Sequence, residues 1–110
     1  MSQPNTTNED FDFDLEILKI TRRNSGAGTW VIGKINDEYR FDALVFPEHA
    51  DNPEWEIGDS RISKLWISRL SNKETSFNWD RGLDIPALSK KVQGVVDFLC
   101  EGLADLVYAE

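Results

Sequence analysis

The chain has 110 residues, of which 40% are hydrophobic, and it carries 20 acidic against 12 basic residues for a net charge of −8. This length fits one domain that can bury a core without disulfides or a metal ion. The negative charge argues against direct binding to nucleic acid or to anionic membranes, because both attract cationic groups. The single cysteine, Cys100, excludes an intramolecular disulfide. This is typical of a reducing compartment, so we expect a cytoplasmic protein.

Residues 1–10 are polar and lack the basic and apolar regions of a signal peptide. We expect them to form a disordered tail, which leaves residues 11–110 as a single domain. In the stretch EDFDFDLEI (residues 9–17), acidic residues alternate with apolar ones, which predicts a strand from Phe11 with its acids on the solvent face. The alternation slips after Ile17. Either a bulge near Ile17–Leu18 or burial of both strand faces would explain the slip.

Four further strands are predicted from similar apolar patterns between turn-forming residues. Their expected ranges are 29–35, 39–46, 61–70 and 75–80. The connections are turns at residues 22–28, 36–38 and 71–73, and a long polar loop at residues 47–59. No apolar run approaches the roughly 20 residues that a membrane helix needs.

The last predicted element is an amphipathic helix. Its apolar residues recur at spacings of three and four; they are Leu88, Val92, Val95, Val96, Leu99, Leu103 and Leu106. Pro86 fits the first helical turn, and Asp84 is expected to cap or approach the N-terminal amides. The expected fold is therefore α+β: an antiparallel β-meander of about five strands with one C-terminal helix packed on one face.

The loop PEHADNPEWE (residues 47–56) concentrates residue types that ligate metals. The candidates are Glu48, His49, Asp51, Glu54 and Glu56. Their spacing matches no calcium loop, and a single histidine excludes a multi-histidine zinc site within one chain. We therefore interpret the segment as a solvated loop without a metal ion. Trp55 could fold back onto the core or serve a partner as an anchor, and we expect the first.

No catalytic or cofactor-binding arrangement is predicted. The Gly-x-Gly of NSGAGTW (residues 24–30) leads into a strand rather than a helix, so we interpret it as a turn and not as a phosphate cradle. Cys100 lies beside Leu99 in the helix, which is typical of a structural thiol. A Gly-x-Ser-x-Gly elbow is absent from the sequence. We therefore expect a protein that is not an enzyme and needs no cofactor.

Two acidic rows form a candidate partner-binding surface. One is Asp12, Asp14 and Glu16 on the first strand, and the other is Asp97, Glu101 and Asp105 on the helix. Their steps of about 6.6 Å and about 6 Å are near twice the rise per phosphate of one DNA strand. Basic residues in segments 19–36 and 60–81 could neutralise the strand row, in which case it would be only a solvated face.

Three stretches resemble a family of small bacterial and phage domains of unknown function. They are GTWVIGKINDEYRFDALVF (residues 28–46), NWDRGLDIP (residues 78–86) and VVDFLCEGLADLVY (residues 95–108). The resemblance covers residues 29–108, and its motifs are structural. It implies one complete small domain and brings no activity or site residue. The WDRG segment itself is interpreted as the junction between the fifth strand and the helix, with an alternative in which Asp80 and Arg81 lie at an anion site.

Three functions remain open from the sequence. The first is a non-catalytic protein-interaction or regulatory domain, monomeric or weakly dimeric, whose partner presents a basic surface. The second is an acidic mimic of nucleic acid that inhibits a DNA- or RNA-binding machine, which requires the two acidic rows to form one surface. The third is a metal-binding or enzymatic domain that uses the loop around His49.

Overall fold

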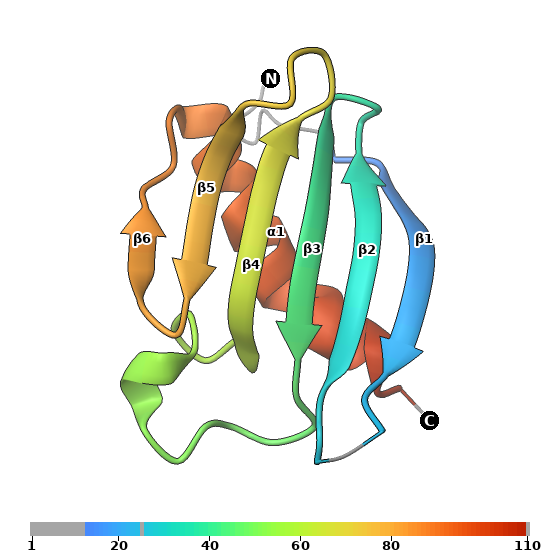
Figure 1. The fold of residues 1–110 in the computed structure, drawn as a ribbon, viewed down its shortest axis with the longest axis vertical. Coiled ribbons are helices and arrows are strands. Elements are labelled where there is room, and N and C mark those ends of the chain that lie inside the picture. The colour runs from blue at the N-terminus through green and yellow to red at the C-terminus, as the bar shows by residue number, and fades with distance from the viewer. Residues whose placement is uncertain (1–12, 25, 110) are drawn as a thin grey trace, which may run out of the picture.

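The computed structural model describes residues 13–24 and 26–109. One antiparallel sheet contains six strands in chain order, with α1 (Lys90–Val107) lying diagonally across one face (Figure 1). The strands are β1 (Leu15–Arg22), β2 (Thr29–Ile35), β3 (Tyr39–Val45), β4 (Ile62–Arg69), β5 (Thr75–Asp80) and β6 (Leu83–Ile85). A one-turn 3₁₀ helix, η2 (Pro53–Trp55), interrupts the long loop. The predicted α+β meander is confirmed, with one strand more than expected.

The irregularity in β1 is a β-bulge. The register against β2 shifts between Ile17 and Lys19. Leu18 and Ile20 are both exposed, so the alternative of a strand buried on both faces is wrong. The predicted start of this strand at Phe11 and the predicted tail at residues 1–10 lie outside the described residues.

The central strands follow their sequence pattern closely. In β2 and β3 every second side chain faces the core. In the loop between them, Asn36 and Asp37 both have positive φ, and the amide of Glu38 donates a 2.9 Å hydrogen bond to the carbonyl of Ile35. The strand residues with the lowest exposure include Val31, Phe41 and Ile67. This alternation makes one sheet face apolar, and that face carries the helix.

The WDRG segment forms a hairpin turn, so its interpretation as a strand-to-helix junction is wrong. Arg81 and Gly82 have φ of 54° and 148° and connect β5 to β6. The Asp84 carboxylate accepts a 2.9 Å hydrogen bond from the Asn78 side chain on β5. Asp84 therefore bonds within the sheet and, contrary to the expectation from the sequence, does not cap the helix. A strand of three residues is too short to show an alternation, which is why the sequence pattern missed β6.

The helix begins later than predicted. Ser89 is the N-cap, and its hydroxyl accepts a 3.1 Å hydrogen bond from the amide of Val92. The amide of Leu88 donates to the carbonyl of Ser76 on β5, so Leu88 belongs to the connection and is exposed. Pro86, expected in the first helical turn, also precedes the helix.

The buried stripe of α1 contains Val92, Val95, Val96, Leu99, Leu103, Ala104 and Val107. Leu106, predicted for this stripe, is exposed; in the last turns of α1 the buried residues are Leu103, Ala104 and Val107. Within residues 13–24 and 26–109, no helix combines the length and the apolar character that crossing a membrane requires.

Candidate functional site

The loop between β3 and β4 lies at one end of the sheet, at the bottom of Figure 1. Its ends are joined where the amide of Phe46 donates a 2.9 Å hydrogen bond to the carbonyl of Arg61. In its middle, the Asn52 side chain accepts a 3.0 Å hydrogen bond from the amide of Glu54 and caps η2. The loop is therefore a folded segment with its own internal contacts.

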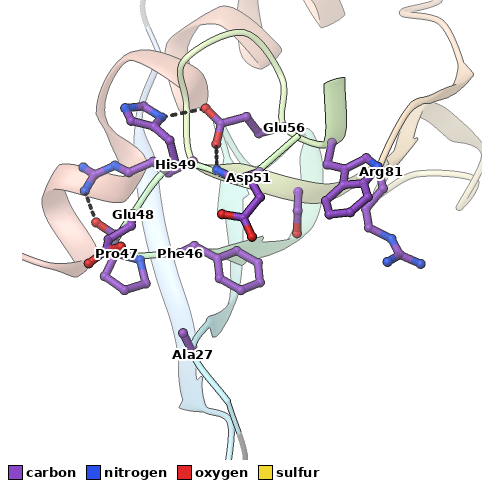
Figure 2. Close-up of a pocket in the computed structure, with 12 residues that line it drawn as sticks. Ala27, Phe46, Pro47, Glu48, His49, Asp51, Glu56 and Arg81 are labelled. Atoms are coloured by element: carbon purple, nitrogen blue, oxygen red, sulfur yellow. Dashed lines mark hydrogen bonds and ion pairs between the residues drawn. The ribbon is translucent and has the colours of Figure 1, made fainter. Parts of the chain in front are cut away.

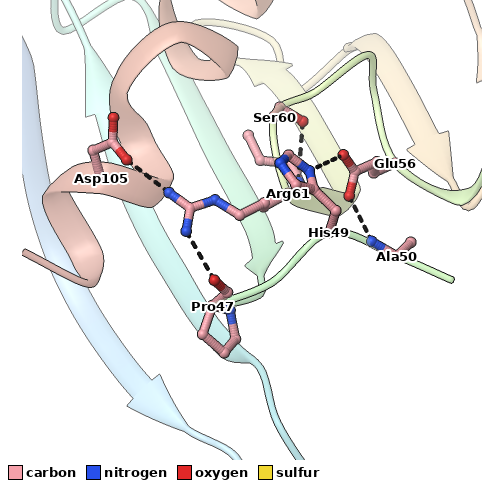
Figure 3. Close-up of polar contacts among 8 residues, drawn as sticks. Pro47, His49, Ala50, Glu56, Ser60, Arg61 and Asp105 are labelled. Atoms are coloured by element: carbon pink, nitrogen blue, oxygen red, sulfur yellow. Dashed lines mark hydrogen bonds and ion pairs between the residues drawn. The ribbon is translucent and has the colours of Figure 1, made fainter. Parts of the chain in front are cut away.

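Glu56 is the buried centre of the loop and is only 4% exposed. Its Oε2 lies 2.7 Å from Nδ1 of His49, and its Oε1 accepts a 2.8 Å hydrogen bond from the amide of Ala50 (Figure 3). The carboxylate thus ties the two arms of the loop together. The sequence identifies both His49 and Glu56 as polar loop residues, but their pairing could not be read from spacing.

Arg61 joins the loop to the helix. Its guanidinium donates to the carbonyl of Pro47 at 2.9 Å and to the carboxylate of Asp105 on α1 at 2.7 Å (Figure 3). Next to it, the hydroxyl of Ser60 interacts with the thiol of Cys100 on α1. Burial raises the pKa of Cys100 to about 11, the Ser60 contact opposes this rise, and the nearby acids of α1 add to it. The loop and the helix therefore form one continuous surface.

A pocket of about 560 Å³ opens beside this loop (Figure 2). It is lined by Ala27, Phe46, Pro47, Glu48, His49, Ala50, Asp51, Trp55, Glu56, Arg61, Ser63 and Arg81. Aromatic and aliphatic side chains thus stand beside acidic ones. Three connections contribute to the pocket: the β1–β2 turn through Ala27, the β3–β4 loop, and the β5–β6 turn through Arg81.

Trp55 lines the pocket and is 44% exposed, so the expectation that it folds onto the core is wrong. The reason is its position in η2, a surface turn without a buried residue. Its carbonyl accepts a 3.3 Å hydrogen bond from the indole of Trp79 on β5, which fixes the turn to the sheet. The indole of Trp55 is thereby left on the outside, where a partner can reach it.

The first acidic row lies on the sheet face away from the helix. Asp14 and Glu16 are exposed, while Leu15 between them packs against the core that α1 covers. Lys34 on β2 lies 3.7 Å from Glu16, so a base partly neutralises this row, as the charge pattern suggested. Asp12 lies outside the described residues.

The second acidic row lies on the helix side of the molecule. Asp97, Glu101 and Asp105 follow each other at intervals of four residues and are all exposed, opposite the buried stripe of α1. The described parts of the two rows therefore point in opposite directions, with the sheet and the helix between them. They do not join into the single surface that the nucleic-acid mimic requires.

The helix row is linked to the β3–β4 loop instead. Arg61, just before β4, donates to Asp105 of the row, and the loop itself contributes four exposed acids: Glu48, Asp51, Glu54 and Asp59. Within the described part of the chain, none of these four carboxylates forms an ion pair with a lysine or arginine. We call these four residues, with the row on α1, the loop–helix acidic surface.

The loop also contains the group of residues best suited to a metal ion. Of the five ligands suggested by the sequence, His49 and Glu56 come together, and Asp59 joins them. One ligand atom from each of the three lies within 4.8 Å of the other two. Sequence reasoning missed Asp59 because it lies just beyond the segment considered.

The glycine-containing segment before β2 forms a turn, as predicted. The amide of Arg23 donates a 3.2 Å hydrogen bond to the carbonyl of Gly28, and β2 follows directly. A helix N-terminus, which a phosphate cradle needs, does not follow this turn in the described chain.

In the comparison with known protein families, the model of a domain of unknown function, DUF7678, matches residues 29–104. The comparisons with curated proteins and with solved structures give no match.

Proposed function

The chain belongs to the DUF7678 family of domains of unknown function, and we propose that it is a non-catalytic protein-interaction domain that binds a lysine- or arginine-rich segment of a cytoplasmic partner. The segment lies across the loop–helix acidic surface and places one cationic side chain in the pocket beside Trp55. The observation that carries this proposal is the pocket lining. It contains the aromatic rings of Phe46 and Trp55 together with Glu48 and Asp51, whose carboxylates form no ion pair with a lysine or arginine of the described chain.

The pocket lining matches the two parts of a lysine or arginine side chain. Such a side chain combines an apolar stem with a cationic head. Phe46 and Trp55 offer apolar and aromatic surface to the stem and cation–π attraction to the head. Glu48 and Asp51, in the same lining, offer charge-assisted hydrogen bonds.

The loop–helix acidic surface extends this match beyond the pocket. Asp97 and Glu101 continue the negative charge along α1, with steps of about 6 Å between successive acids. Unpaired carboxylates of one sign raise the association rate of a basic partner. The opposite placement of Asp14 and Glu16 supports this function over the nucleic-acid mimic, which needs both rows together.

The two arginines that line the pocket differ in their effect on the binding of a cationic side chain. Arg61 is already neutralised by Asp105 and hydrogen-bonded to Pro47, so it adds little positive charge. Arg81 forms no ion pair with another described residue and therefore opposes a cationic ligand. Replacing Arg81 by alanine is expected to strengthen the binding of a basic segment.

Cys100 supports the non-catalytic part of the proposal. With its pKa raised to about 11 by burial, its thiol is almost entirely protonated near neutral pH. The thiolate is the nucleophilic form, so this cysteine is poorly suited to covalent catalysis. In the fold its thiol, on α1, contacts the hydroxyl of Ser60 in the loop.

The test is an NMR titration of the isotopically labelled chain with an unstructured peptide of alternating lysine and glycine. We expect amide shifts concentrated in the loop at residues 46–61 and along the exposed side of α1, weakening as salt rises. An aspartate–glycine peptide of the same length serves as the control and is expected to cause none. Shifts centred on β1, or equal shifts with both peptides, would overturn the proposal.

A further inference from the structure

We propose that His49, Glu56 and Asp59 bind a divalent transition-metal ion of the Zn²⁺ or Mn²⁺ class. This inference does not require the binding of a basic segment, although His49 and Glu56 also line the pocket and Asp59 belongs to the loop–helix acidic surface. It rests on three observations: the convergence of three ligand atoms, the burial of one carboxylate, and the mixed nitrogen and oxygen chemistry of the group.

The three side chains are already close to the geometry of a coordination shell. Their ligand atoms lie within 4.8 Å of one another. Ligands that bind a tetrahedral Zn²⁺ at about 2.0–2.1 Å lie roughly 3.4 Å apart. Closing this difference needs only small side-chain rotations, since Asp59 is exposed and the His49 ring is largely exposed. At the pair already in contact, Nδ1 of His49 and Oε2 of Glu56 lie 2.7 Å apart and would separate slightly around an ion.

The burial of Glu56 indicates why a cation would be favoured there. A buried carboxylate is costly unless its charge is compensated. Glu56 has no lysine or arginine partner within the described chain, and His49 balances its charge only when the imidazole is protonated. The carboxylate has about four lone-pair positions, and its contacts with His49 and Ala50 occupy two. A metal ion held by both side chains would place positive charge beside this buried carboxylate.

The ligand set defines the class of metal. Imidazole nitrogen favours Zn²⁺ and neighbouring first-row ions, whereas carboxylate oxygen also accepts Mn²⁺, Mg²⁺ and Ca²⁺. One imidazole with two carboxylates resembles the three protein ligands of an open zinc site, with water completing the shell. Ca²⁺ prefers six to eight oxygen ligands, which these three residues do not provide. Zn²⁺ and Mn²⁺ are therefore expected to bind more tightly than Ca²⁺ and Mg²⁺.

The experiment is calorimetry of the full chain with zinc chloride and manganese chloride, each metal alone. We expect saturable binding of one ion per chain, and at least about tenfold weaker binding in Asp59→Asn and in His49→Gln. Both residues are exposed, so these variants should retain the fold, which circular dichroism checks. Glu54→Gln is the matched control, because it removes a carboxylate from the same loop but outside the group; its affinity should change less than about twofold.

A second readout locates the ion. Bound Mn²⁺ broadens the NMR signals of nearby amides, and we expect the broadening to centre on residues 49–59. The proposal is overturned if neither metal gives saturable heat. It is equally overturned if Asp59→Asn and His49→Gln bind as tightly as the unmodified chain, or if the broadening centres elsewhere.

Discussion

The guanidinium of Arg61 donates a 2.7 Å hydrogen bond to the carboxylate of Asp105, across 44 positions of sequence. This contact fastens the start of β4 to the last turns of α1. It also neutralises one acid of the helix row, while Asp97 and Glu101 keep their charge on the surface without a basic partner in the described chain. The loop–helix acidic surface depends on this connection for its continuity.

Breaking the connection should loosen the loop with little effect on global stability. In Asp105→Asn the ion pair is lost, and because the Asp105 side chain is exposed the free energy of unfolding should fall by only about 0–1 kcal/mol. Amide hydrogen exchange in residues 47–59 should nevertheless become faster. Glu101→Gln, in the same row but without a contact to Arg61, is the control. Unchanged exchange rates in Asp105→Asn would contradict this role.

Gly33 of β2 has no room for a side chain. A Cβ at this position would lie 2.6 Å from the carbonyl oxygen of Glu16 and 2.7 Å from the ring of Phe41. Gly33→Ala should therefore destabilise the fold by about 1–3 kcal/mol, measured by chemical denaturation. Gly102→Ala is the matched control, because a Cβ there meets nothing within 4 Å and favours the helix. An equal effect of the two substitutions would contradict the tight packing at Gly33.

Leu99 and Leu106 lie on the same helix but differ in burial, with exposures of 1% and 54%. Leu99→Ala should lower the free energy of unfolding by about 2–5 kcal/mol, since it leaves a cavity between α1 and the sheet. Leu106→Ala should change it by less than about 0.5–1 kcal/mol. Thermal unfolding followed by circular dichroism distinguishes the two. A similar loss in both variants would contradict the difference in burial between the two positions.

Cys100 should react slowly with thiol reagents. Its pKa of about 11, against an ordinary value of 9.0, leaves little thiolate at pH 8. The folded chain should therefore react roughly one hundredfold more slowly than the chain unfolded in urea. Reaction at the same rate in both states would contradict the burial of the thiol.

The same raised pKa gives stability a pH dependence. Well below pH 9 the thiol is protonated in both the folded and the unfolded chain. Between pH 9 and about 11 only the unfolded chain loses its proton, so the contribution of Cys100 to stability is lost as the pH rises. Cys100→Ser, which does not titrate there, should show a shallower decline than the unmodified chain in this range. Parallel curves would refute the effect.

The sequence pattern predicted the central fold well because two signals agreed there. In β2 and β3 the apolar residues alternate over the full strand length, and Asn36-Asp37 supplies a turn that fixes their register. The bulge after Ile17 was visible because an extra residue changes the alternation. The errors occur where the apolar residues show no regular spacing. The strand β6 has only three residues, which is too short for an alternation. The start of α1 is set by the Ser89 cap and not by the apolar stripe.

The site was less predictable, since its geometry depends on contacts between distant segments. Composition identified the loop around His49, but nothing in the spacing shows that Glu56 is buried while its neighbour Trp55 is exposed. That difference arises from η2, which turns the indole outward, and from the hydrogen bonds that draw Glu56 inward. The two acidic rows look equivalent in the sequence, and only the packing of α1 on one sheet face separates them.

The most direct test of the proposed binding surface compares two double variants in calorimetry with the lysine–glycine peptide. Glu48→Gln with Asp51→Asn and Asp14→Asn with Glu16→Gln each remove two carboxylates, so they change the net charge equally. We expect the first pair to weaken binding by about tenfold or more, because the carboxylates that line the pocket are lost. The second pair, which lies outside the pocket lining, should change the affinity by less than about twofold. Equal weakening by both pairs would mean that net charge alone attracts the peptide, which would contradict a binding site at the loop.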